Sequence, residues 1–173
     1  MKKYILVIIT LALLSCSSPS VENYSDTTPT LKLNEFFNGE LVAHGMVLDI
    51  NGALSRRFVA KITGTWQGKQ GTLDEKFEYD DGEKDTRVWQ LTQLEDGSFQ
   101  GTANDVIGVA TGKSAGAAFY WRYDLEIIVD QEPLIVTLDD WMYLIDENML
   151  LNKSQIIKYG VEVGEVILSI RKL

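Results

Sequence analysis

Residues 118–129 have the sequence AFYWRYDLEIIV, in which apolar and charged side chains alternate. The apolar set is Phe119, Trp121, Tyr123, Leu125, Ile127 and Val129, and the charged set is Arg122, Asp124 and Glu126. Residues 56–67, RRFVAKITGTWQ, alternate in the same way. Because successive side chains of a strand point to opposite faces, this period of two predicts β-strands with one buried face.

Turn signals separate further segments of this kind. Examples are Asn38-Gly39, Asn51-Gly52 and Asp96-Gly97, which are typical of hairpin turns. About nine strand-like segments result, with no long helical stretch between them, so an antiparallel meander is favoured over parallel βαβ units. We expect an all-β protein in which the meander closes into a barrel of about 8–10 strands, whose interior is filled or holds one small ligand. A membrane-spanning barrel is the competing architecture, but it would place charged faces such as that of residues 122–126 in lipid.

The composition fits one domain and excludes several kinds of function. The chain has 173 residues, with 16 Lys and Arg against 25 Asp and Glu, and a formal net charge of −9. Since it has no basic block that could grip phosphate, we expect no nucleic-acid partner. One Cys and one His rule out a disulfide framework and a Cys/His zinc cluster, and they leave His44 without a partner for acyl transfer or metal binding. We therefore predict no metal, no cofactor and no enzymatic activity.

The N-terminus has the layout of a signal peptide. Met1-Lys2-Lys3 precedes an uncharged apolar run over residues 4–14, and Ser15 and Cys16 follow it. The run is too short for a transmembrane helix, which needs about 20 residues. The Leu-x-Ser-Cys ending resembles the lipobox of bacterial lipoproteins. An ordinary signal peptide with an incidental cysteine is the alternative.

The lipobox resemblance implies that residues 1–15 are removed and that Cys16 becomes the first residue, carrying a diacylglycerol thioether and a further acyl chain such as palmitate. Two or more chains hold a protein stably at a membrane. Ser17 in place of an aspartate implies sorting to the outer membrane. Loss of Lys2 and Lys3 leaves 14 basic and 25 acidic residues, a net charge of −11, so the lipid must hold the protein without help from a basic patch. We expect residues 16–33 to form the lipidated cysteine and a flexible tether, and residues 34–173 to form the barrel.

Residues 138–143, LDDWMY, place two acidic side chains inside an apolar run. Neighbours on a strand point to opposite faces, so either Asp139 or Asp140 must face inward, where a carboxylate needs a cation or several donors. Arg56, or its neighbour Arg57, and Arg87 are the candidate cations. Such a pair is either a structural salt bridge or a ligand-orienting contact. Because the two aspartates point apart, they cannot flank one glycosidic bond.

The four tryptophans, Trp66, Trp89, Trp121 and Trp141, lie in four separate segments. Plain packing accounts for most aromatic side chains in a β-rich core. If these four converge, however, they line an apolar cavity with polar tips, which is the usual composition of a small-ligand site.

Several fragments taken together resemble a known family. They are Phe37-Asn38-Gly39, GALSRRF at 52–58, Gly64-Thr65-Trp66, Asp81-Gly82-Glu83, Arg87-Val88-Trp89, GTANDVIG at 101–108 and DDWMY at 139–143. From about residue 34 to the C-terminus, the chain resembles the bacterial lipoproteins grouped as domain of unknown function 3833. The usual Asn-Arg-Ser of that family is here Asn152-Lys153-Ser154, which lacks arginine's bidentate fork. The resemblance implies a lipocalin-like barrel but no particular activity.

We therefore predict an outer-membrane-anchored periplasmic lipoprotein that binds a small amphipathic or lipid-like ligand. The four tryptophans are its candidate wall residues, and Arg56, Arg87 and Asp139 or Asp140 are its candidate polar contacts. The alternative is a non-enzymatic interaction or envelope-maintenance lipoprotein with a filled barrel. A third hypothesis, an enzyme that acts on lipid through the Asp139–Asp140 region, lacks a nucleophile or metal set. A binder requires an enclosed cavity bounded by aromatic side chains, and an interaction protein requires a packed barrel with an exposed apolar patch. An enzyme requires a carboxyl of raised pKa that faces an open cleft.

Overall fold

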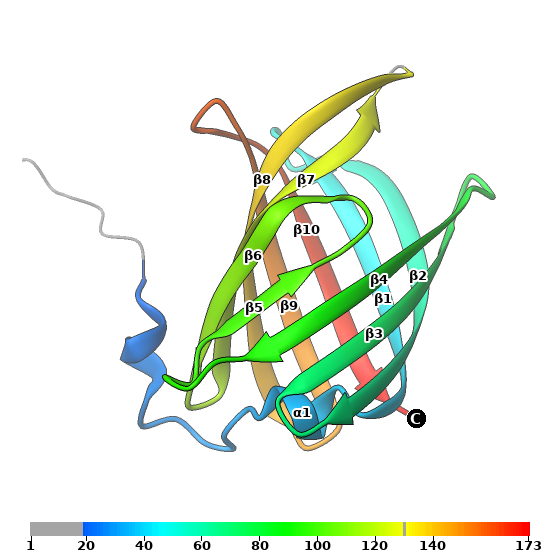
Figure 1. The fold of residues 1–173 in the computed structure, drawn as a ribbon. Helices are drawn as coiled ribbons and strands as arrows, with labels where there is room; N and C mark the ends of the chain where they lie inside the picture. Colours follow the sequence, from blue (N-terminus) through cyan, green and yellow to red (C-terminus); the bar gives the residue numbers. More distant parts are fainter. Residues whose placement is uncertain (1–18, 130) are drawn as a thin grey trace, which may run out of the picture.

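The computed structural model describes residues 19–129 and 131–173, which form ten strands and two short helices (Figure 1). The elements are η1 Val21–Tyr24, α1 Leu33–Phe36, β1 Gly39–Asp49, β2 Leu54–Gln67, β3 Gln70–Tyr79, β4 Lys84–Gln93, β5 Phe99–Thr102, β6 Val106–Ala115, β7 Ala118–Val129, β8 Glu132–Asp146, β9 Met149–Lys158 and β10 Val161–Lys172. The predicted signal peptide and Cys16 lie outside the described residues. No helix of the described part is both long enough and apolar enough to cross a membrane.

The strands form one closed antiparallel barrel. Each strand pairs with its neighbours in sequence, and β1 pairs with β10 to complete the ring. The fold class predicted from the sequence, an all-β meander closed into a lipocalin-like barrel, is therefore confirmed.

The alternation in the sequence becomes the inner and outer faces of the wall. In β2, Phe58, Ala60 and Ile62 are buried, whereas Val59 and Lys61 between them are exposed. Gly52 and Gly97, in two of the predicted turns, have φ values of +77° and +83°. Glycine is favoured there because a side chain is strained in the left-handed region.

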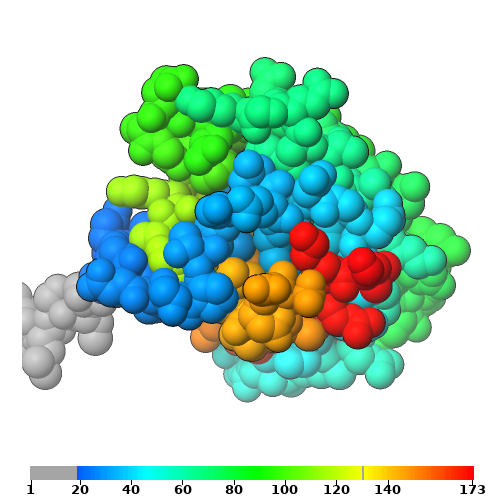
Figure 2. Space-filling view, turned by 90° about the horizontal axis from the view of Figure 1, so that it is seen from below, coloured from blue at the N-terminus to red at the C-terminus, as the bar shows by residue number. Residues whose placement is uncertain are grey.

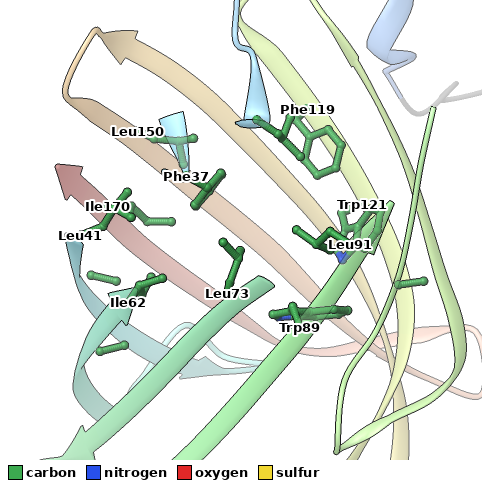
Figure 3. Close-up of a cluster of buried hydrophobic side chains, with 14 of the residues drawn as sticks. Phe37, Leu41, Ile62, Leu73, Trp89, Leu91, Phe119, Trp121, Leu150 and Ile170 are labelled. Carbon is green, nitrogen blue, oxygen red and sulfur yellow. The ribbon is translucent and has the colours of Figure 1, made fainter. Parts of the chain in front are cut away.

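One end of the barrel is closed by the segment that contains α1 (Figures 1 and 2). Leu33 and Phe36 of α1 are buried, and so is Phe37, which follows and belongs to the same buried cluster as Leu41 and Leu150 (Figure 3). The indole Nε1 of Trp66 donates a hydrogen bond to the carbonyl oxygen of Phe37, at 3.0 Å. The α1 end is thus an apolar plug fixed to the wall by a directional contact.

The predicted tether differs from the structure between residue 19 and residue 33. Val21 and Leu31 are buried, the backbone N–H of Leu31 donates to the carbonyl of Gly116 at 2.8 Å, and Glu22 pairs with Lys113 at 2.6 Å. The expectation of a flexible tether over this part is corrected. Its few apolar side chains have a place on the barrel, and its polar groups find hydrogen-bond partners there.

Gly64 allows the α1 segment to approach the wall, because a Cβ atom at this position would overlap the carbonyl oxygen of Phe37. We expect Gly64→Ala to lower the free energy of unfolding by about 1–3 kcal/mol, as overpacking does in a filled core. Urea denaturation measures this change. Thr65→Ala is the control, since Thr65 is exposed on the outer face, and it should change the free energy by less than about 0.5 kcal/mol. Equal effects of the two substitutions would contradict this account of the closed end.

Candidate functional site

The barrel encloses a cavity of about 700 Å³, a volume typical of small-molecule sites. Leu33 and Phe37 close it at the α1 end, and its lining reaches Ser55, Glu83 and Ile128 near the hairpin ends at the opposite end. The cavity is therefore a pocket with one closed end and a mouth.

Arg87 of β4 forms the central ion pair of the cavity. Its Nε donates to both carboxylate oxygens of Asp105, at 2.9 and 2.8 Å, and its Nη2 donates to Oδ2 at 2.6 Å. Both side chains are mostly buried, with 18% and 20% of their surface exposed. Burial opposes the charge of Arg87, but the hydrogen bond with Asp105 and the neighbouring acidic groups outweigh it and raise the pKa of the guanidinium. Arg87 therefore keeps its positive charge, and this charge is paired with the carboxylate of Asp105.

Glu75 of β3 lies directly opposite Arg87 in the strand register. Its carboxylate is 3.9 Å from Arg87 Nη1, beyond hydrogen-bond distance, and 13% of its side chain is exposed. Burial raises the pKa of Glu75 to about 7, Arg87 lowers it in part, and Asp105 and Asp140 raise it further. Glu75 is thus a carboxyl that titrates near neutral pH.

Asp140 of β8 is the inward-facing member of the aspartate pair. It is 5% exposed, and Oδ1 accepts hydrogen bonds from Asn152 Nδ2 and, at 2.8 Å, from Ser154 Oγ, both on β9. Burial raises the pKa of Asp140 to about 6, although these hydrogen bonds, Arg87 and Tyr123 lower it. The prediction that one of the two aspartates faces inward and needs several donors is confirmed.

Arg56 lies at the mouth, on the inward parity that its position in β2 predicts. Its Nη2 bonds Glu83 at 2.6 Å and Asp81 at 3.0 Å, and its guanidinium lies 3.5 Å from the ring centre of Tyr79. Its Nε is buried and has no acceptor among the described residues. Arg56 therefore joins the β3–β4 turn to β2 at the mouth.

Two of the four tryptophans line the cavity. Trp89 and Trp121 form part of its wall, with their ring centres 5.7 Å apart in an edge-to-face arrangement. Trp66 does not line it, because its indole packs at the closed end against Gly71 and bonds Phe37. The convergence expected for all four is therefore corrected to these two.

Asp139 and Trp141 face away from the cavity, because they flank the inward-facing Asp140 on the same strand. Asp139 pairs with Arg122 and accepts a hydrogen bond from the Tyr120 hydroxyl at 2.7 Å. The ring of Trp141 lies 4.8 Å from that of Tyr120 and 6.0 Å from that of Tyr24 of η1. The candidates Asp139 and Trp141 are thus corrected to an outer-face cluster on which η1 packs.

The polar side chains of the inner cavity wall lie on one side, among apolar ones, and the other side is apolar. Glu75, Arg87, Tyr123, Asp140 and Asn152 come from β3, β4, β7, β8 and β9. The lining residues of β1, β10 and the adjacent part of β2 are apolar apart from Ser55 and Arg56 near the mouth; they are Ala43, Val47, Phe58, Ala60, Ile62, Val166, Leu168 and Ile170. This distribution suits a molecule with a polar end and an apolar body.

Glu75 and Asp105 are cavity residues that the sequence analysis missed. Glu75 could have been found, because it has the parity of Leu73 and Phe77 in a strand that alternates. Asp105 lies in a turn, where no periodicity indicates which way a side chain points. No three or more His, Cys, Asp or Glu side chains of the described part are arranged to hold a metal ion.

A family model described as a protein of unknown function, DUF3833, matches residues 10–172. The chain belongs to this family. A comparison with curated protein sequences gives no significant match. Among solved structures, the DUF3833 barrel is similar to the S-type phycobiliprotein lyase CPES from Guillardia theta, with a TM-score of 0.57 and 14% sequence identity over 90% of this chain and 99% of that chain. At this identity the similarity shows the fold alone.

The fragments that carry the DUF3833 resemblance meet at three places in the barrel. At the closed end, Trp66 donates to Phe37, and at the mouth Arg56 pairs with Asp81 and Glu83. Inside the cavity, Arg87 pairs with Asp105. Asp140, also inside the cavity, accepts hydrogen bonds from Asn152 and Ser154. Lys153 instead pairs with Glu165 at 2.7 Å, and 58% of its side chain is exposed. The lysine of the Asn152-Lys153-Ser154 segment therefore lies outside the cavity.

Glu75→Gln and Asp140→Asn should each make the protein more stable than the wild type at pH 8. Burial raises the pKa of these carboxyls from 4.5 to about 7 and from 3.8 to about 6, so the folded state binds more protons than the unfolded chain, and stability is lost as the pH rises through this range. Each substitution removes one such loss, on the order of 1–3 kcal/mol at pH 8, with little difference at pH 4.

Urea denaturation of each variant at pH 4 and pH 8 measures this effect as a difference from the wild type. Glu147→Gln, on the exposed β8–β9 turn, is the control and should match the wild type at both pH values. If both cavity variants were less stable than the wild type at pH 8, the ionised carboxylates would be stabilising, contrary to the assignment.

Proposed function

We propose that this protein binds a small amphipathic molecule inside its barrel. The observation that carries the proposal is the cavity of about 700 Å³, closed at the α1 end, with a polar and an apolar side. Ala43 and Ala60, paired across β1 and β2, keep the apolar side open because their side chains are small. The lipocalin-like architecture supports the proposal only by analogy, since one barrel fold hosts many functions.

The alternative of a filled barrel does not fit this interior. A non-enzymatic interaction protein with a packed core needs no pocket, and it gains nothing from buried carboxyls. Binding accounts for both features, and we propose that it proceeds without chemical change to the ligand.

One observation favours a second candidate, an enzyme that uses Glu75 or Asp140 as a general acid or base. Both carboxyls have raised pKa values inside a cavity, which is the pattern of many catalytic carboxyls. Mass spectrometry of the ligand after incubation separates the two functions. A binder returns its ligand unchanged, whereas an enzyme returns a product.

We further propose that the protein is a lipoprotein held at the periplasmic face of the outer membrane by lipid on Cys16. The support is the sequence of the N-terminus, with its positive start, its apolar run and its lipobox-like ending. An acidic chain is repelled by anionic lipid, so a covalent anchor of two or more acyl chains is the physical means by which it would stay at a membrane.

Filling the apolar side should weaken ligand binding. We expect Ala60→Trp to weaken binding of N-phenyl-1-naphthylamine, a neutral fluorescent probe of apolar sites, at least tenfold, because the indole occupies the cavity. Val59→Trp is the matched control, since the neighbouring Val59 is 38% exposed on the outer face. Fluorescence titration measures both, and thermal unfolding verifies that both variants fold. Equal binding by the two variants would place the probe outside the barrel.

Cys16→Ser should abolish lipid attachment. In cells grown with radiolabelled palmitate, we expect the wild type to be labelled and to sediment with the membrane fraction, and the variant to be unlabelled and released from it. Ser17→Ala is the control that leaves the cysteine in place. Label retained on the Cys16→Ser protein would contradict the anchor proposal.

A further inference from the structure

The charged side chains that line the cavity are unequal in number. Six are acidic, Glu75, Glu83, Asp85, Asp105, Glu126 and Asp140, whereas two are basic, Arg56 and Arg87. With these groups ionised, the pocket carries a surplus of negative charge, which raises the local concentration of cations and lowers that of anions.

Both arginines are already paired within the chain. Arg87 is bidentate with Asp105, and Arg56 bonds Asp81 and Glu83 while it lies over Tyr79. The carboxylate of a fatty acid, or a phosphate, that bound Arg87 would have to break its pair and leave the mostly buried Asp105 without its cation. At the mouth, the partners of Arg56 are exposed, with 56% of the Asp81 side chain and 62% of the Glu83 side chain accessible, and an anion there would meet these two carboxylates. Arg87, the cation inside the cavity, is therefore not a free anion site.

Glu75 and Asp140, by contrast, keep unused acceptor capacity. No donor of the described residues is within hydrogen-bond distance of Glu75, whose closest cation is Arg87 at 3.9 Å. Asp140 is nine-tenths buried, and its two donors from β9 bond the same oxygen, Oδ1. The third side chain that hydrogen-bonds it, Tyr123, is neutral like the other two. Neutral donors solvate a carboxylate but do not cancel its charge.

The two carboxyls also lie within electrostatic reach of one another. The charge of Asp140 contributes to raising the pKa of Glu75, and Arg87 lowers the pKa of both. One cation that already pairs with Asp105 thus serves three carboxyls. The group missing from this arrangement is a second cation.

We propose that the ligand supplies this cation: the polar group that Glu75 and Asp140 bind is a protonated amine on an apolar body. The inference rests on the proposed binding function and specifies its ligand class, a cationic amphiphile. An ammonium group has three donors and no acceptor, which matches two carboxylates with free lone pairs. Its apolar body lies along the apolar side formed by β10, β1 and β2.

Three ligands that share one alkyl chain test the proposal: dodecylamine, dodecanol and dodecanoate. Each is titrated against N-phenyl-1-naphthylamine bound to the whole protein at pH 8, below the critical micelle concentration of the two charged ligands and below the solubility limit of dodecanol, and fluorescence reports displacement of the probe. We expect dodecylamine to displace the probe at a concentration at least tenfold lower than dodecanoate, with dodecanol in between.

The Glu75→Gln/Asp140→Asn double variant removes two negative charges from the cavity and should reduce this preference to less than threefold. The matched control is Glu78→Gln/Glu147→Gln, which removes two negative charges from exposed positions on β3 and the β8–β9 turn. The control should keep the full preference. If it lost the preference as well, the overall charge of the protein would account for the effect, and the proposed contacts would be wrong.

Glutamine at position 75 also separates two roles of this carboxyl. A protonated Glu75 that donated to a ligand carbonyl would be replaced well by glutamine, which donates too. An ionised Glu75 that binds an ammonium would not, so we expect the Glu75→Gln single variant alone to weaken dodecylamine binding at least threefold. Unchanged affinity in this variant would overturn the role given to Glu75.

Failure of the charge inference is distinguishable from failure of the binding function. If the probe binds and is lost in Ala60→Trp, but dodecanoate displaces it as well as dodecylamine does, the cavity binds ligands and the cationic class is wrong. If the probe binds equally to the wild type and to Ala60→Trp, the binding function itself is wrong, and the proposed ligand class, a cationic amphiphile, is then wrong as well.

Discussion

The contact between β4 and the β5–β6 turn is the interaction on which the rest of the interior depends. Strand β5 is only four residues long and pairs with residues 90–93 of β4, so the earlier part of β4, which pairs with β3 on one edge, has no strand on its other edge. The side chain of Asn104 takes the place of a strand there, because it accepts from Val88 N and donates to the Thr86 carbonyl, both at 3.0 Å. The next residue, Asp105, reaches Arg87. One turn therefore completes the wall and neutralises a buried guanidinium, which would be strongly destabilising if it were left unpaired.

That pairing determines the electrostatics of the cavity. Because Asp105 occupies Arg87 with three hydrogen bonds, Glu75 is left at 3.9 Å from the same guanidinium and Asp140 depends on neutral donors. A barrel selected for stability alone would do as well or better with apolar residues at such positions, since burying a charge without a full partner is unfavourable. We therefore interpret the surplus of carboxyls as a feature that binds the ligand of the pocket.

The sequence predicts much of this arrangement, and strand parity explains both its successes and its errors. Alternation predicts the closed β-meander, the inward position of Arg56 and the presence of one buried aspartate. Alternation cannot decide which of Asp139 and Asp140 faces inward, because the residues on both sides of the pair are apolar. The outer face is apolar here because an aromatic cluster of Trp141 with Tyr24 lies on it. Asp105 and the packing of residues 19–33 on the barrel could not be predicted, since turns and irregular segments have no period and their contacts are made with strands far away in the sequence.

The outer-face ion pair gives Asp139 a structural role that bears on the cavity. In the register of β7 with β8, Arg122 is opposite Asp139 on the outside and Trp121 is opposite Asp140 on the inside. A slip of one residue would reverse every side chain of β8, so that Asp139 would enter the cavity and Asp140 would leave it. The apolar flanks of the pair oppose such a slip only weakly, because both faces of this strand are apolar. The contacts of Asp139 with Arg122 and with the Tyr120 hydroxyl, on the other hand, form in one register alone. The two aspartates therefore have different roles on the two faces of β8. Asp139 fixes the strand register on the outside, and this register places Asp140 in the cavity.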